Sequence, residues 1–305
     1  MASDVRVTAP TEERNPATTG IDTASTLEVL TLLNDADRTV AGAVAQVLPE
    51  LASLVDHAVE SIRAGGHVHY FGAGTSGRLS VLDAAELLPT FNAPDGLFVA
   101  HHAGGAAALV GAVENVEDDV DLGRGDASDL TALDVAIGLT ASGRTPYIAG
   151  ALAEARARGA RTALVTANPG AELTAYADHL LAADTGPEVL TGSTRLKAGT
   201  AQKMILNGFS TAVMIRLGHT YSNLMVDVVA TNAKLRGRVV RILQEATGVS
   251  EVDARAVLDR TGGELKPALV ALLAAVPVEK AVAALDAHGN SVATALAGLT
   301  AGTTK

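Results

Sequence analysis

The chain has 305 residues and a formal net charge of −11, and 48% of its residues are hydrophobic although only 3% are aromatic. This length allows one large α/β domain and a smaller unit, with a core built mainly from Ala, Val and Leu. The negative charge argues against nucleic acids and anionic membranes as partners. The sequence contains no cysteine, which excludes disulfides, thiolate metal ligands and a cysteine nucleophile.

Sequence signals for export or membrane insertion are not evident. No apolar run approaches the ~20 residues that a transmembrane helix requires, and residues 1–15 lack an apolar signal core. We therefore expect a cytoplasmic protein that does not bind membranes.

The first part of the chain predicts an arm followed by helices. Residues 1–23 are polar and rich in Thr, which is typical of an arm rather than a packed element. Ser25 and Glu28 have the spacing of a capping box that opens a helix. Pro49 suits the first turn of a second helix, which we expect to run to about residue 63.

From residue 67 onward the pattern of strand, loop and helix repeats. Apolar strands that alternate with helices predict an α/β fold with a parallel sheet covered by helices on both faces. Ligands of such sheets bind at the carboxyl ends of the strands. The predicted strands are 68–71, 97–100, 134–139, 162–166 and 180–183.

The remainder of the chain is predicted to be helical. One helix is expected near 195–217 and another near 229–247, followed by short Ala- and Leu-rich helices. These short helices are interrupted at Gly262-Gly263, Pro277 and Gly289. The predicted organisation is an arm over 1–23, a main domain with leading helices over 24–247, and a small helical module over 248–305.

A glycine-rich loop, Gly72-Ala73-Gly74-Thr75-Ser76-Gly77, joins the first predicted strand to a helix. A glycine turn with two hydroxyls at a helix start directs backbone N–H groups at a phosphate. The same glycines fit a dinucleotide fingerprint, but that site requires an acidic residue at the end of the next strand. Here strand 97–100 is followed by His101-His102. The loop therefore favours a phosphomonoester over a nucleotide.

Two further segments have the composition of anion-binding loops. Thr140, Ser142 and Arg144 follow strand 134–139, at the same edge of the predicted sheet as the glycine-rich loop. Ser193 and Thr194 precede a predicted helix start, where an anion would be stabilised. A capped helix with solvated cations explains this last segment equally well.

Acidic residues occur at two places where acid–base chemistry could be carried out. Glu86 lies on the helix that follows the glycine-rich loop, and Glu114 and Glu117 belong to an acidic run over 114–119. Acid–base catalysis needs two carboxyl groups with separated pKa values. From the pattern alone, solvated surface residues are the preferred interpretation at both places.

The histidines do not have the spacing of a metal site, so we expect no metal. The adjacent residues His101 and His102 could line a pocket, but packing at the strand end explains them more simply.

These motifs together resemble the N-acetylmuramic acid 6-phosphate etherases, bacterial enzymes of the sugar isomerase (SIS) domain superfamily. The resemblance covers nearly the whole chain and thins only in the C-terminal module. It is carried by the segments 15–22, 71–79, 140–147, 191–207 and 223–232, including the run Lys197-Ala198-Gly199-Thr200-Ala201-Gln202-Lys203.

The resemblance implies a three-layer SIS fold, a homodimer, no cofactor and cleavage of the D-lactyl ether of a muramic acid phosphate during cell-wall sugar recycling or catabolism. It implies Glu86 as the catalytic acid and Glu117 as a second acid–base residue, with Glu114 as the nearest alternative. The implied sugar-phosphate ligands are Gly74, Thr75, Ser76, Gly77, Thr140, Ser142, Arg144, Ser193 and Thr194.

Two other functions remain open at this point. One is a non-catalytic protein that senses sugar phosphates, as the vertebrate glucokinase regulatory protein does, and the other is an aldose–ketose isomerase of sugar phosphates. The vertebrate regulator has two such domains in tandem, whereas this chain has one. The two glutamates and the segment 191–207 favour the etherase.

Overall fold

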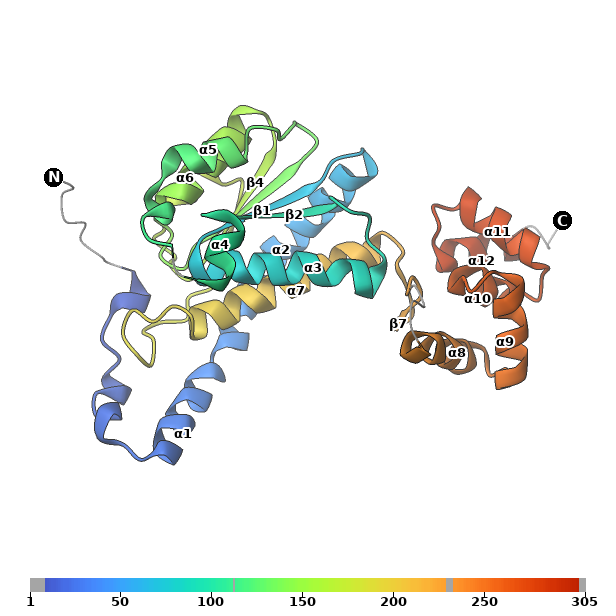
Figure 1. Cartoon of the computed structure of the whole chain (residues 1–305), viewed down its shortest axis with the longest axis horizontal. Helices are drawn as coiled ribbons and strands as arrows, with labels where there is room; N and C mark the ends of the chain where they lie inside the picture. Colours follow the sequence, from blue (N-terminus) through green and yellow to red (C-terminus); the bar gives the residue numbers. More distant parts are fainter. Residues whose placement is uncertain (1–8, 112, 229–232, 302–305) are drawn as a thin grey trace. The chain divides into compact units, whose positions relative to one another are not determined.

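The computed structural model describes residues 9–111, 113–228 and 233–301 (Figure 1). The chain forms two compact units, one from residues up to 84 with 96–210 and the other from 85–95 with residues from 211 onward. The second unit includes residues 211–247, whereas the boundary predicted from the sequence falls after residue 247. The physical reason is that Val239 and Leu243 share a hydrophobic core with Leu269 and Leu285.

The first unit contains a five-stranded sheet in the order β2-β1-β3-β4-β5. All neighbouring strands are parallel, and Gly72 at the end of β1 pairs in register with His102 of β2 and Leu139 of β3. Each strand overlaps one predicted run, so the predicted α/β fold is confirmed. The strands are β1 (Val68–Gly72), β2 (Phe98–His102), β3 (Val135–Leu139), β4 (Arg161–Thr166) and β5 (His179–Ala182).

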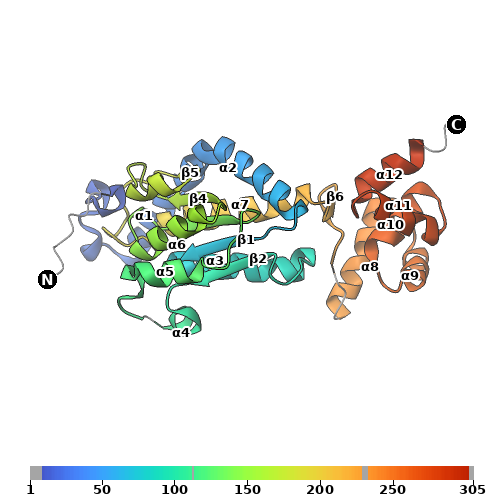
Figure 2. The same cartoon turned by 90° about the horizontal axis from the view of Figure 1, so that it is seen from above.

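Helices cover both faces of this sheet, as Figures 1 and 2 show. Because both faces are covered, β3 is buried along its whole length, which explains its continuous apolar sequence. One face carries α5 (Val120–Asp126) and α6 (Pro146–Ala157). The other carries α2 (Val40–Arg63), α3 (Gly74–Phe91) and α7 (Lys197–Arg216), while α4 (Gly105–Val110) follows β2.

The segment before the first long helix is hydrogen-bonded to the rest of the first unit. The Thr18 hydroxyl donates to the carbonyl of Val189 at 2.8 Å, and the amide of Gly192 donates to the carbonyl of Thr11 at 3.0 Å. Three short turns form here, at Pro10–Glu12, Pro16–Thr18 and Ile21–Thr23. Residues 9–23, expected as an arm, therefore contact residues 187–192 through polar groups, which hydrophobic patterning does not reveal.

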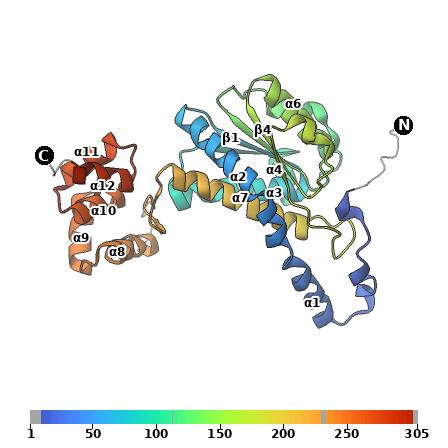
Figure 3. The ribbon, with the colours of Figure 1, turned by 180° about the vertical axis from the view of Figure 1, so that it is seen from behind.

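The two leading helices differ in how well the sequence predicts them. Helix α1 (Thr26–Asp37) begins at the predicted capping box of Ser25 and Glu28. Pro49, however, lies inside α2 rather than at its start. Buried residues at Val44, Val47 and Leu51 continue one apolar stripe across the proline, so packing maintains the helix where the proline removes one hydrogen bond. Figure 3 shows α1 beside the start of α2, away from the sheet.

The second unit is a hairpin followed by helices around its own hydrophobic core. Breaks occur at the predicted glycines and proline, and Gly262, Gly263 and Gly289 adopt positive φ angles. Among the described residues no single helix is long and apolar enough to cross a bilayer, and the helices Leu265–Ala274 and Val278–Ala287 meet that test only as a pair bent by 109°. The elements are β6 (Thr220–Tyr221), β7 (Leu224–Met225), α8 (Ala233–Thr247), α9 (Glu251–Arg260), α10 (Leu265–Ala274), α11 (Val278–Ala287) and α12 (Val292–Ala301).

Candidate functional site

The glycine-rich loop brings the start of α3 into direct contact with the end of β1. Gly74 begins the helix with a φ of +54°, which favours glycine. A Cβ atom on Gly77 would lie 2.6 Å from the carbonyl oxygen of Gly72 and 2.6 Å from Cδ2 of His102. Only glycine fits at position 77, and its absence of a side chain lets the helix start close to two strand ends.

Ser76, in the first turn of α3, is linked to α7. Its hydroxyl donates a hydrogen bond of 2.9 Å to Oε1 of Gln202, and the side chains of both residues are buried. In the same region, a Cβ on Gly199 would lie 3.6 Å from Cγ2 of Thr75 and 3.4 Å from the carbonyl oxygen of Thr194. The fold therefore brings the predicted ligands Thr75, Ser76 and Thr194 into one neighbourhood.

The second predicted loop follows β3, and β3 is the direct neighbour of β1 in the sheet. The hydroxyl of Thr140 lies 2.7 Å from that of Thr145 and 3.3 Å from that of Ser142. The backbone amide of Gly143 donates to the Thr140 hydroxyl at 3.3 Å. Gly143 has a φ of +74°, which allows this tight turn. The two loops thus start at adjacent strand ends, where the strand order reverses direction, which is the usual ligand position in a doubly wound sheet.

Two residues near this second loop, Asn168 and Glu172, were not predicted from the sequence. Nδ2 of Asn168, which follows β4, donates to the carbonyl of Ser142 at 2.9 Å. Nε of Arg144, a mostly buried side chain, lies 3.2 Å from a carboxylate oxygen of Glu172. The positive charge of Arg144 is therefore paired with a carboxylate of the chain.

The amides at the helix start after Ser193 and Thr194 already have an acceptor from the chain itself. The carboxylate of Glu188 accepts hydrogen bonds from the amides of Lys197 and Ala198 at 3.0 Å and 2.9 Å. Burial raises the pKa of Glu188, whereas the two amides and the Lys197 charge act in the opposite direction. Glu188 thus occupies the two amides at the helix start where the sequence suggested a bound anion. The roles of Ser193 and Thr194 in ligand binding remain predictions.

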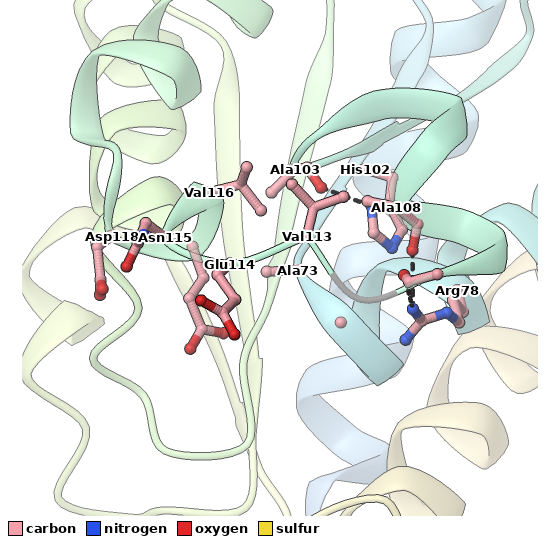
Figure 4. A pocket seen from close by; sticks show the side chains of 13 residues that line it. Ala73, Arg78, His102, Ala103, Ala108, Val113, Glu114, Asn115, Val116 and Asp118 are labelled. Carbon is pink, nitrogen blue, oxygen red and sulfur yellow. Dashed lines mark hydrogen bonds between the residues drawn. The ribbon is translucent and has the colours of Figure 1, made fainter.

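A cavity of about 420 Å³ lies beside the glycine-rich loop and contains both candidate glutamates of the acidic run. Figure 4 shows His102 and Arg78 on one side of it and Asn115 and Asp118 on the other. The glutamates Glu114 and Glu117 are themselves exposed. The cavity is lined by Ala73, Gly74, Arg78, His102, Ala103, Ala108, Gly111, Val113, Glu114, Asn115, Val116, Glu117 and Asp118.

The two adjacent histidines have different environments. His101 stacks on Phe71 with ring centroids 4.5 Å apart, which is the packing role expected from the sequence. His102 is buried and lines the cavity, and its Nδ1 lies 2.8 Å from the carbonyl oxygen of Ala103. Because a carbonyl only accepts, Nδ1 is the donor in this contact. Among the described residues Nε2 has no hydrogen-bond partner.

Helix α3 is anchored by Asp83, three residues before Glu86. Asp83 is buried and accepts hydrogen bonds from the hydroxyls of Tyr70 and Ser210, at 3.0 Å and 3.1 Å. It also accepts one from the side-chain amide of Asn207. Burial raises the pKa of Asp83, although these hydrogen bonds lower it. This network, which the sequence did not reveal, ties α3 to β1 and α7. Glu86 itself is an exposed residue of α3, and its catalytic role remains a prediction.

Comparisons with known proteins agree with this architecture. Residues 50–156 match the family model of the glucokinase regulatory protein N-terminal SIS domain, and residues 109–212 match the SIS domain. A solved phosphoheptose isomerase from Francisella tularensis aligns with a TM-score of 0.52 over 63% of this chain and 100% of its own, at 19% identity. At that identity the likeness concerns the fold alone.

Curated relatives match over nearly the full length. A Thermobifida fusca protein named N-acetylmuramic acid 6-phosphate etherase is 61% identical over 267 residues, which are 88% of each chain. A Pectobacterium atrosepticum protein of the same name is 52% identical over 293 residues, 95% of this chain and 97% of its own. On this identity and coverage, the chain belongs to the N-acetylmuramic acid 6-phosphate etherase family.

Proposed function

We propose that this protein is a carbon–oxygen lyase that converts N-acetylmuramic acid 6-phosphate and water into N-acetylglucosamine 6-phosphate and D-lactate. The observation that carries this proposal is the 61% identity to a relative of that name over 88% of both chains. The neighbouring loops at the ends of β1 and β3, with a cavity containing two glutamates next to the first loop, support it.

The proposed reaction is an elimination followed by addition of water. Opening of the sugar ring gives an aldehyde at C1, which acidifies the proton at C2. A base removes that proton, the C3–O bond breaks, and lactate leaves with a proton from an acid. Water then adds across the C2–C3 double bond, so that hydroxyl is restored at C3 and a proton at C2. The proposed chemistry needs only positioned acids and bases.

We assign the 6-phosphate to the glycine-rich loop and the loop after β3. Ser76 and Ser142 would donate their hydroxyls, together with the backbone N–H groups of residues 74–77, of which that of Gly77 already donates to the carbonyl of Ala73 at 3.2 Å. Binding energy from the phosphate, which is remote from C2 and C3, would position the reacting carbons. The other proposed contacts are Thr75, Thr140, Arg144, Ser193 and Thr194.

We assign Glu86 as the acid that protonates the departing lactate and Glu117 as the C2 base. Glu114 is the alternative base, since both Glu114 and Glu117 line the cavity beside Gly74. A positioned carboxylate base contributes about 10²–10⁴-fold to such a proton transfer.

We also propose a cytoplasmic homodimer. No residue of α1 is buried, and Leu27 and Leu30 on this helix are 74% and 57% exposed. A capped helix that leaves Leu27 and Leu30 exposed, while Val29, Leu32 and Leu33 are only partly buried, offers an apolar surface to a second copy.

The test is incubation of the purified protein with N-acetylmuramic acid 6-phosphate, with D-lactate and N-acetylglucosamine 6-phosphate measured in parallel. We expect equal amounts of both products. Binding of the sugar phosphate without lactate release would support the sensor instead, and formation of a ketose phosphate from an aldose phosphate would support the isomerase.

A further inference from the structure

Arg78 links the glycine-rich loop to the segment that precedes the acidic run. It directly follows Gly77 in α3 and donates from Nε to the carbonyl of Leu109 at 2.9 Å. Its Nη2 donates to the carbonyls of Ala108 and Gly111, at 2.8 Å and 2.9 Å. All three carbonyls belong to the end of α4 and the residue after it.

The end of a helix leaves carbonyl groups without partners, and cationic side chains stabilise them. A guanidinium reaches several carbonyls at once because its donors are held in a rigid planar fork, whereas the ammonium of lysine is a single point. Arg78 therefore fixes the C-terminal end of α4 relative to the first turn of α3.

A second anchor lies close to Glu117. A Cβ on Gly104 would lie 3.3 Å from Cγ1 of Val116, and Val116 packs against the hydrophobic core that includes residues of α6. Asn115, between the two anchors, adopts a φ of +65°. Glu117 then follows Val116 within the short turn Val116–Asp118. Thus Arg78 holds Gly111, and Val116, which directly precedes the proposed base Glu117, packs against the core.

We propose that Arg78 is a positioning residue that couples the phosphate-binding loop to the carboxylate of Glu117. The inference rests on the proposed function. Through Arg78, the helix start that holds the phosphate and the segment that carries the base adopt one fixed arrangement. Displacement of a catalytic group by about 1 Å can reduce turnover ~10²-fold, so loss of this contact affects the chemical step rather than substrate binding.

The experiment compares Arg78→Met and Arg78→Lys with wild type, measuring kcat, KM for N-acetylmuramic acid 6-phosphate and the inhibition constant of inorganic phosphate. We expect kcat to fall roughly 10–100-fold in Arg78→Met and less in Arg78→Lys, with KM and the phosphate constant within about threefold. Arg124→Met is the matched control, because Arg124 is an exposed arginine paired with Asp121 on α5; its kinetics should equal those of wild type.

A double-mutant cycle separates positioning from other roles. In a Glu117→Gln background, Arg78→Met should have little further effect on kcat, because the group that Arg78 positions is already gone. Additive losses would overturn the proposal, and a parallel rise in KM and the phosphate constant would show that Arg78 binds the phosphate itself. Thermal melting shows whether Arg78→Met folds; if it does not, Arg78→Lys provides the same cycle.

Kinetics distinguish a failure of the proposed function from a failure of the proposed role of Arg78. If the wild type releases no lactate, the proposed function is wrong. If the wild type is active and Glu117→Gln is impaired, but Arg78→Met and Arg78→Lys have wild-type turnover, only the positioning role is wrong.

Discussion

The hydroxyl of Ser76 donates its hydrogen to Oε1 of Gln202 at 2.9 Å, and both side chains are buried at the start of α3 and in α7. For Ser76 to donate to a phosphate, this hydroxyl has to rotate. Rotation of the Gln202 amide would then let Nε2, which has no partner among the described residues, donate to Ser76.

Ser76→Ala should raise KM for the sugar phosphate about tenfold or more, because a hydrogen bond to a charged group contributes roughly 1.5–3 kcal/mol. The inhibition constant of inorganic phosphate should rise in parallel. Ser80→Ala is the control, since Ser80 is also buried in α3 but donates to the carbonyl of Ser76 within the helix. Unchanged KM and phosphate inhibition in Ser76→Ala would remove this residue from the phosphate site.

Asp83→Ala should lower the free energy of unfolding by about 3 kcal/mol or more, because it leaves the buried hydroxyls of Tyr70 and Ser210 without their acceptor. Urea unfolding measures this loss. Asp35→Ala provides the comparison, as Asp35 is exposed on α1. A loss no larger than that of Asp35→Ala would mean that the network does not stabilise the fold.

His69 should make stability depend on pH. Burial, followed by the charge of His101, lowers the pKa of His69 to about 4 from an unfolded value of about 6.5. Between these values the unfolded chain binds a proton that the folded protein does not, so the free energy of unfolding decreases as pH falls through this range.

His69→Phe retains an aromatic ring beside Phe71 and His101 and removes the titrating group. Denaturant unfolding at several pH values from 7 to 4 should show a shallower decrease than in wild type. His67→Phe, which replaces an exposed histidine, should retain most of the wild-type slope. Equal slopes for wild type and His69→Phe would contradict the assignment.

Leu27→Glu combined with Leu30→Glu should produce a monomer if α1 forms the contact between two copies. The reason is that two carboxylates would be buried in an apolar interface. Light scattering measures the mass, and Val252→Glu, an equally exposed position in the second unit, should remain a dimer. A wild-type monomer with full activity would overturn the dimer proposal.

The sheet and the glycine-rich turn from β1 into α3 were predictable because local rules determine them, although residues 74–77, expected in a loop, form the first turn of α3. Each strand contains an apolar run, and Gly72, Gly74 and Gly77 mark the close approach of strand and helix. The interruptions of the C-terminal helices follow the glycines and Pro277 in the same way.

Long-range polar contacts were not predictable from the chain. Asp83 is hydrogen-bonded to Ser210, which is 127 residues away in the sequence, and Thr18 to Val189, which is 171 residues away. Glu188 occupies the helix start for which the sequence suggested a bound anion, because any carboxylate near two free amides fits there. Arg78 contacts carbonyls about thirty residues away, which residue type and spacing alone do not reveal.

In the proposed reaction two glutamates have separate roles, with Glu117 as the C2 base and Glu86 as the acid. The most direct measurement follows deuterium entry at C2 and lactate release together, for wild type, Glu86→Gln and Glu117→Gln in deuterated water. Glu117→Gln should lose both, whereas Glu86→Gln should lose lactate release by orders of magnitude and retain some exchange, because deprotonation precedes lactate departure. Exchange in Glu117→Gln equal to that of wild type would contradict the account and indicate Glu114 as the base.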